Sequence, residues 1–236
     1  MKEKIIFKNV SLFFDLKKNY KNNKSKKTMI NSIIDKNISG GKIIALNRLN
    51  IELEEKNIYG LYGPNGSGKS CFLKLLAKIN HPSIGNIHIP FDAVFLGTNQ
   101  FSFEPRATGE ENAKLYLKLK NVSEIQINEK IDKIRSACEL GEFFYQQVHI
   151  YSSGMMMRLA FACSQMINSE LLLMDEWVST ADKDMREYIY NSLNNKIEKS
   201  KITVIASHNI EVLKQHCTKI IFFKNGQIEE IRDVRN

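Results

Sequence analysis

The chain has 236 residues, 43% of them hydrophobic, and a formal net charge of +8. Its length suits a single domain over residues 1–236, or one domain with a small inserted lobe, and its hydrophobic content is enough for a core. No run approaches the roughly 18 uncharged apolar residues that a membrane span needs, and the N-terminal sequence lacks the apolar core of a signal peptide. The four cysteines are scattered without a C-x-x-C pair, so we expect free thiols in a reducing compartment and neither a disulfide framework nor a cysteine metal site.

The first part of the chain has strand patterns that a lysine-rich segment interrupts. Alternating apolar residues predict a strand over residues 4–14, and the pattern returns at 43–46 and 49–53. Between them, residues 15–42 are rich in Lys, Asn and Ser, which predicts a long loop with one or two helical turns.

Residues 57–77 predict a strand, a glycine-rich loop and a helix. The loop is Gly63-Pro64-Asn65-Gly66-Ser67-Gly68-Lys69-Ser70, which fits G-x-x-x-x-G-K-S and is called the phosphate loop below. Its glycines let successive N–H groups point at phosphate oxygens, and the helix that follows presents its positive end to the same anion. We expect Lys69 to reach the β- and γ-phosphates of a nucleotide and the Ser70 hydroxyl to help hold Mg²⁺.

The rest of the chain alternates strands and helices. Strands are predicted at 87–89, 93–96, 171–175, 202–206 and 219–223, and helices at 109–120, 124–140, 153–167, 182–199 and 208–216. Asn225-Gly226 predicts a hairpin turn into a last strand at 227–231. Buried strands alternating with helices indicate an α/β fold with a parallel core sheet.

Two carboxylates follow the apolar run at 171–174. Asp175 and Glu176 are expected at the carboxyl tip of a buried strand, beside the phosphate loop in sheets of this kind. Asp175 would act on Mg²⁺, directly or through water, and Glu176 would polarise the attacking water.

Further motifs carry a resemblance to a known family. The pentapeptide Tyr151-Ser152-Ser153-Gly154-Met155 opens a predicted helix, and His208 follows a strand. With the phosphate loop and Asp175-Glu176, this order resembles the nucleotide-binding subunit of ABC transporters. The pentapeptide with R-L-A-F-A after it, Thr108-Gly109-Glu110-Glu111-Asn112 (T-G-x-E-N) and Asp175-Glu176-Trp177 are similar to the subgroup that exports capsule, O-antigen or teichoic-acid chains. The resemblance covers nearly all of residues 1–230.

The resemblance implies the fold and the activity. We expect a P-loop NTPase core with a mostly parallel sheet, an antiparallel β subdomain, a helical signature subdomain at about residues 101–165 and a lysine-rich insertion at about 15–42. The family implies ATP and Mg²⁺ as cofactors, ATP hydrolysis, a homodimer and an integral membrane permease subunit. The chain would work peripherally at the cytoplasmic face of the cell (inner) membrane on a lipid-linked polysaccharide, with no nucleic acid as partner.

The resemblance also assigns residues. The phosphate loop and Cys71, where the family usually has threonine, would bind ATP. Residues 151–155, the signature pentapeptide, would contact the γ-phosphate held by the opposite subunit through Ser153 and Gly154, the alternative for the serines being a plain helix cap. His208 would contact the γ-phosphate, and Asp182 would bridge the subunits, cap the next helix, or do both.

Two assignments rest on position alone. Gln100 lies where the family carries a glutamine that senses Mg²⁺ and the membrane partner, although the polysaccharide subgroup often departs from this pattern. Phe13 and Phe14 end the first strand, as the family's adenine-stacking aromatic does, and we choose Phe14.

Alternative interpretations stay open. The lysines at 17–27 could contact anionic lipid headgroups or a glycan pyrophosphate, but we favour a solvated loop. The chain could serve export of another substrate, such as a drug or a lipid, against which the signature pentapeptide and D-E-W argue. It could also be a non-hydrolysing, ATP-gated interaction module, against which Lys69 and Glu176 argue.

Overall fold

The structure is a computed structural model that describes residues 3–15, 38–39, 41–97, 103–175 and 196–234. Two compact units make up the chain: residues 1–93 with 201–236 form unit 1, and residues 94–200 form unit 2. No helix among these described residues is long and apolar enough to cross a membrane.

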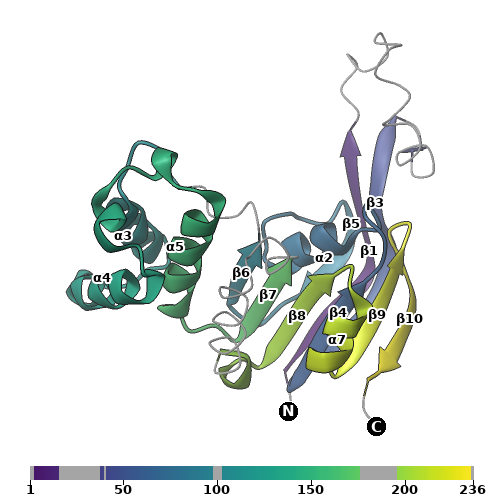
Figure 1. The fold of residues 1–236 in the computed structure, drawn as a ribbon. Helices are drawn as coiled ribbons and strands as arrows, with labels where there is room; N and C mark the ends of the chain where they lie inside the picture. Colours follow the sequence, from purple (N-terminus) through teal and green to yellow (C-terminus); the bar gives the residue numbers. More distant parts are fainter. Residues whose placement is uncertain (1–2, 16–37, 40, 98–102, 176–195, 235–236) are drawn as a thin grey trace. The chain divides into compact units, whose positions relative to one another are not determined.

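Unit 1 contains an antiparallel sheet and a mostly parallel one (Figure 1). The antiparallel sheet has the order β2-β3-β1-β5, with β1 Lys4–Asp15, β2 Ile38–Ser39, β3 Lys42–Glu54 and β5 Ile84–His88. In the other, β4 (Asn57–Tyr62) runs parallel to both β8 (Ile202–Ser207) and β9 (Lys219–Lys224), and β10 (Gln227–Asp233) pairs antiparallel with β9. The helices of this unit are α2 (Lys69–Leu76) and α7 (Ile210–His216).

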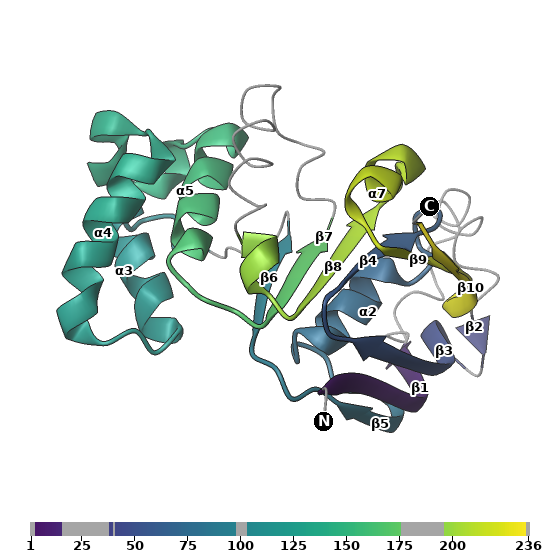
Figure 2. The ribbon, with the colours of Figure 1, turned by 90° about the horizontal axis from the view of Figure 1, so that it is seen from below.

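Three aromatic side chains fix α2 in unit 1. The Phe72 ring of α2 stacks on Phe7 of β1 at 4.9 Å between centroids and packs on Phe223 of β9 at 5.3 Å. All three side chains are buried, and Figure 2 shows α2 running between the two sheets. The helix that follows the phosphate loop is therefore anchored on both sides by aromatic burial.

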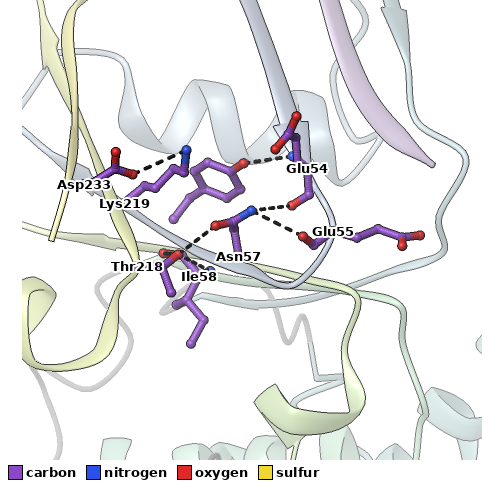
Figure 3. A network of polar contacts seen from close by, with 8 residues as sticks. Glu54, Glu55, Asn57, Ile58, Thr218, Lys219 and Asp233 are labelled. Carbon is purple, nitrogen blue, oxygen red and sulfur yellow. Dashed lines mark hydrogen bonds and ion pairs between the residues drawn. The ribbon is translucent and has the colours of Figure 1, made fainter. Parts of the chain in front are cut away.

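A polar network closes the opposite end of β4 (Figure 3). The Asn57 amide donates to the carbonyls of Glu54 and Glu55, both at 3.3 Å, and the Thr218 hydroxyl accepts from the Ile58 N–H at 3.0 Å. The buried Tyr59 hydroxyl accepts from the Glu54 N–H at 2.8 Å. The bond between Ile58 and Thr218 connects the start of β4 to the residue before β9. The bonds of Asn57 and Tyr59 hold the turn that precedes β4.

Unit 2 contains the helix that begins within the signature pentapeptide and the helices that pack with it. It contains α3 (Gly109–Leu119), α4 (Glu124–Cys138), two 3₁₀ helices (Gly141–Tyr145 and Val148–Ile150) and α5 (Ser153–Gln165), which pack around one apolar cluster. Strands β6 (Ala93–Gly97) and β7 (Leu171–Asp175) are hydrogen-bonded neighbours. Of the helix predicted at 182–199, only residues 196–199 lie in the described chain, and they are helical.

Two lysines close the carboxyl end of α5. Lys196 Nζ donates to the carbonyls of Ser164 and Ile167, and Lys130 Nζ donates to the carbonyl of Met166 at 2.7 Å. Lys196 is 8% exposed, and this burial lowers the pKa of its ammonium to about 8. Cations at this end also complement the helix dipole.

Several predicted element limits were wrong. The strands predicted at 43–46 and 49–53 are one strand, β3, because Arg48 adopts a φ of 51° that breaks the alternation without ending the strand. The helix predicted from residue 208 begins at Ile210, since the Asn209 side chain caps it by accepting from the N–H groups of Glu211 and Val212. The strand predicted at 87–89 is β5, which starts at Ile84 and pairs with β1.

Candidate nucleotide-binding site

The phosphate loop joins the carboxyl end of β4 to the start of α2. Its shape is fixed by its own turn, in which the Ser67 N–H donates to the Pro64 carbonyl at 3.2 Å. The N–H of Gly226, in the β9–β10 hairpin, donates to the Ser67 carbonyl at 2.9 Å. One hydrogen bond within the loop and one from the β9–β10 hairpin therefore hold the loop in its conformation before a ligand binds.

Glycine is required where the loop meets its surroundings. Gly68 has a φ of +111°, and a Cβ there would lie 2.8 Å from Leu46 Cδ2. A Cβ on Gly63 would lie 2.3 Å from the Phe223 carbonyl oxygen. An added side chain would clash with backbone at Gly63, and at Gly68 it would be strained by the positive φ.

The Lys69 ammonium lies within the curl of the loop. The residue is 5% exposed, and its Nζ donates to the carbonyl oxygens of Gly63 at 2.7 Å and Pro64 at 3.1 Å. Two loop carbonyls therefore hold the ammonium inside the loop, where it would contact a phosphate group that the loop surrounds.

Two further features of the loop fit an anion. Helix α2 has no side-chain cap at its Gly68 N-cap and no acidic residue in its first turn, so its first N–H groups are suited to an anionic ligand. Ser67 is 3% exposed, and its hydroxyl has no hydrogen-bond partner within the described part of the chain. Because buried polar groups are nearly always satisfied, we expect this hydroxyl to donate its hydrogen to a ligand oxygen.

His208 reaches the same edge of the sheet as the phosphate loop. In the parallel pairing of β4 and β8, Tyr62 is opposite Ser207, so Gly63 and His208 both follow directly from paired residues. Asn209 begins the next helix as its cap, which leaves His208 exposed between strand and helix. This placement is compatible with contact to a phosphate in the loop, and the γ-phosphate role stays a prediction.

The two candidate stacking aromatics differ in exposure. Phe14 is 42% exposed near the end of β1, whereas Phe13 is half-buried. The Phe13 N–H donates to the Ser83 hydroxyl at 3.0 Å. Phe14 offers the freer ring face for a base, but its role also stays a prediction.

The signature pentapeptide opens α5 in unit 2. The Ser152 hydroxyl caps the helix by accepting from the Met155 N–H at 3.2 Å, so the cap alternative holds for this serine. Ser153 is exposed, and a Cβ on Gly154 would meet nothing closer than 3.8 Å. Tyr151, in contrast, is buried, and this raises the pKa of its hydroxyl to about 12. The contact with a nucleotide predicted for the pentapeptide can thus come from Ser153 and Gly154, while Tyr151 anchors it.

Asp175 is the last residue of β7 and is partly buried. Glu176, Asp182, Gln100 and the lysines at 17–27 lie outside the described residues, and their roles stay predictions. Sequence reasoning missed Gly226, whose N–H braces the phosphate loop. Asn225-Gly226 was recognised only as a hairpin signal, with φ values of 49° and 75° that bear out the turn.

Comparison with known proteins identifies the family. The sequence profile described as ABC transporter matches residues 46–179, which include the phosphate loop, the signature pentapeptide and Asp175. The chain belongs to the ABC transporter family. This confirms the resemblance drawn from the motifs.

Curated relatives refine the comparison. The chain is 34% identical over 191 residues to the teichoic acids export ATP-binding protein TagH of Bacillus anthracis, covering 81% of this chain and 35% of the relative. It is 32% identical over 240 residues to the O-antigen export system ATP-binding protein RfbE of Yersinia enterocolitica, covering 98% of each. The chain therefore spans about a third of the length of that TagH and nearly all of RfbE. Teichoic-acid and O-antigen export are two of the systems that the motifs resemble.

A solved structure supports the fold. The dimeric post-hydrolysis state of the ATP-binding cassette MJ0796 bound to ADP and Pi aligns with a TM-score of 0.76 at 22% identity, over 98% of this chain and 99% of that one. The chain thus has the ATP-binding cassette fold, and the predicted fold class is confirmed.

The cysteines give a direct test of the phosphate loop as a nucleotide site. Cys71 in the first turn of α2 is partly exposed, whereas Cys138, Cys163 and Cys217 are buried, and burial raises the pKa of each of these three thiols. We expect a maleimide to label Cys71 first, because a thiol at a helix N-terminus is reactive. ATP at ten times its dissociation constant should slow this labelling about tenfold.

Mass spectrometry of the peptide that carries Cys71 measures the effect. Cys71→Ser is the control that should remove the fast label. A labelling rate at Cys71 that ATP leaves unchanged would contradict the placement of the nucleotide.

Proposed function

We propose that this chain is the ATP-hydrolysing nucleotide-binding subunit of an ABC transporter that exports a lipid-linked cell-surface polysaccharide. The observation that carries the ATP site is the buried Lys69 ammonium, held by two carbonyls inside the phosphate loop at the start of the uncapped helix α2. The substrate class is supported by the export systems for which TagH and RfbE are named.

The chain's own residues supply the chemistry. The loop N–H groups and Lys69 bind the β- and γ-phosphates, and His208 contacts the γ-phosphate from the paired strand end. The Ser70 hydroxyl and the Asp175 carboxylate are the groups that would hold Mg²⁺, which neutralises charge on the phosphates when bound. Glu176 directly follows Asp175 and orients and polarises the attacking water.

Two copies of the chain complete each site. Ser153 and Gly154 form the start of α5, where Ser153 is exposed and the space beside Gly154 is open. This helix start suits contact with a γ-phosphate held by a second copy. Closure and opening of this homodimer would be passed to an integral membrane permease. The net charge of +8 suits peripheral work at an anionic cytoplasmic leaflet.

Phosphate release tests this proposal. We expect the purified chain to turn over ATP in the presence of Mg²⁺, and the chain reconstituted with its permease to be stimulated by lipid-linked glycan. Stimulation by the lipid without glycan, or by a drug, would favour the alternative substrates. A chain that binds ATP but releases no phosphate, alone or with the permease, would favour the ATP-gated module.

A further inference from the structure

The T-G-x-E-N segment lies beside the segment that leads into the signature pentapeptide. We call residues 104–112 the T-G-x-E-N turn and residues 146–151 the signature lead, both in unit 2. Their backbone bonds run from the N–H groups of Gly109, Val148 and His149 to the carbonyls of Gln146, Ala107 and Pro105, at 3.2, 3.0 and 2.9 Å. An antiparallel bridge between Thr108 and Gln147 completes the pairing.

The T-G-x-E-N turn is internally fastened by its own polar side chains. Thr108 and Glu111 form a capping box, with Thr108 N–H to Glu111 Oε2 at 2.8 Å and Glu111 N–H to Thr108 Oγ1 at 3.1 Å. Asn112 is 2% exposed, and its Oδ1 accepts from the Glu104 N–H at 2.7 Å. Its Nδ2 donates to the carbonyls of Glu104, Ala107 and Thr108 at 3.1, 3.3 and 2.9 Å. Such a satisfied buried network makes the turn a rigid support.

This support presents a bare backbone to Tyr151. A Cβ on Gly109 would lie 2.4 Å from the Tyr151 hydroxyl oxygen and 2.8 Å from the Phe144 carbonyl oxygen. The Tyr151 hydroxyl donates to the Phe143 carbonyl at 2.5 Å, so the ring is locked at both sides. Only glycine at position 109 leaves room for the ring as it lies.

We infer that Gly109 and Asn112 are positioning residues for the signature pentapeptide, acting through the buried Tyr151 ring. Asn112 holds the turn, the turn brings Gly109 against Tyr151, and Tyr151 directly precedes Ser152, which caps α5 through the Met155 N–H. The expected effect on ATP hydrolysis rests on the proposed function. In this inference the T-G-x-E-N motif supports the signature pentapeptide.

Four variants isolate the contact, one of them Tyr151→Phe alone as the reference for the double variant. Gly109→Ala should displace the Tyr151 ring. Adding Tyr151→Phe removes the nearest clashing oxygen and leaves the ring carbon Cζ 3.4 Å from the new methyl. The double variant should therefore recover in part, because the Phe144 carbonyl oxygen stays 2.8 Å from that methyl. Gly141→Ala is the control, because Gly141 has a φ of +53° but nothing within 4 Å of an added Cβ. It strains the backbone of the same unit without touching Tyr151.

The rate of amide hydrogen exchange at residues 151–157, measured without nucleotide, reports whether the start of α5 stays in place. We expect Gly109→Ala to speed exchange about tenfold or more by local opening, Gly141→Ala to leave it unchanged, and the double variant to return toward the rate of Tyr151→Phe alone. Wild-type exchange in Gly109→Ala, or a double variant no slower than the single one, would overturn the inference.

The rate of ATP hydrolysis measures the effect of this displacement on turnover. Because a misplacement of about 1 Å can cost roughly 10²-fold in rate, Gly109→Ala should lose about tenfold or more in turnover while its affinity for ATP stays unchanged. Wild-type turnover in Gly109→Ala would refute positioning. A wild-type protein without turnover would refute the proposed function instead, and hydrogen exchange would still decide whether Gly109 holds Tyr151.

Discussion

Lys69→Ala should abolish ATP hydrolysis, with turnover at least about 10²-fold below wild type, as expected when a preorganised charge on the reacting phosphates is removed. The Lys69 ammonium is held by the Gly63 and Pro64 carbonyls inside the loop, and an alanine leaves no group that reaches a phosphate from there. Binding of ATP should weaken as well, since the same charge meets the ground-state phosphates.

The fold should survive this change. The two lost hydrogen bonds contribute about 1 kcal/mol each, and the cost of burying an ammonium disappears with them. Phosphate release and thermal unfolding measure the two effects. Lys69→Met keeps the aliphatic stem and should be equally inactive, whereas Lys74→Ala removes an exposed lysine of the same helix and should be fully active. Wild-type turnover by a folded Lys69→Ala protein would remove the phosphate-loop hypothesis.

The phosphate loop could be predicted from sequence because its constraints are local. Glycines, Lys69 and the flanking strand and helix follow one another in eight to twenty residues, and each has its own backbone or charge requirement. The contact between Ser67 and Gly226 could not be predicted in this way. It depends on the pairing of β4 with β9, which brings a distant hairpin beside the loop.

Helix starts and strand breaks show a second limit. Ser207, His208 and Asn209 are consecutive polar residues, and the cap is Asn209 because its side chain accepts from two N–H groups. Arg48 reads locally as a break in alternation, but tertiary pairing of β3 with β1 continues on both sides of it. In both cases the sequence pattern indicated the element and the packed structure decided its limits.

Tyr151 shows why a motif match does not give a side chain's direction. The resemblance includes it in the signature pentapeptide, whose contact with the neighbouring nucleotide is assigned to Ser153 and Gly154, and the Tyr151 ring packs inward against Gly109. That direction depends on a glycine more than forty residues earlier in the chain. The motif residues therefore divide into those that can face a ligand and those that hold them.

Glu176→Gln should separate ATP binding from hydrolysis. Glutamine keeps the shape and hydrogen bonding of the side chain but loses the negative charge that polarises water, so hydrolysis should fall by about 10²-fold or more. ATP binding should remain, because Lys69, Ser70 and Asp175 are unchanged. Glu198→Gln, an exposed carboxylate of unit 2, is the matched control and should hydrolyse ATP as the wild type does.

With hydrolysis blocked, nothing reopens the proposed sandwich, so Glu176→Gln should accumulate as an ATP-bound dimer. Size-exclusion chromatography or sedimentation with Mg²⁺-free ATP detects the dimer. Adding Ser153→Arg to the same chain should prevent it, since the exposed start of α5 would then place a bulky side chain where the γ-phosphate of the second copy lies. A Glu176→Gln protein that stays monomeric with ATP would count against the sandwich, and wild-type turnover by that protein would show that Glu176 is not the catalytic carboxylate.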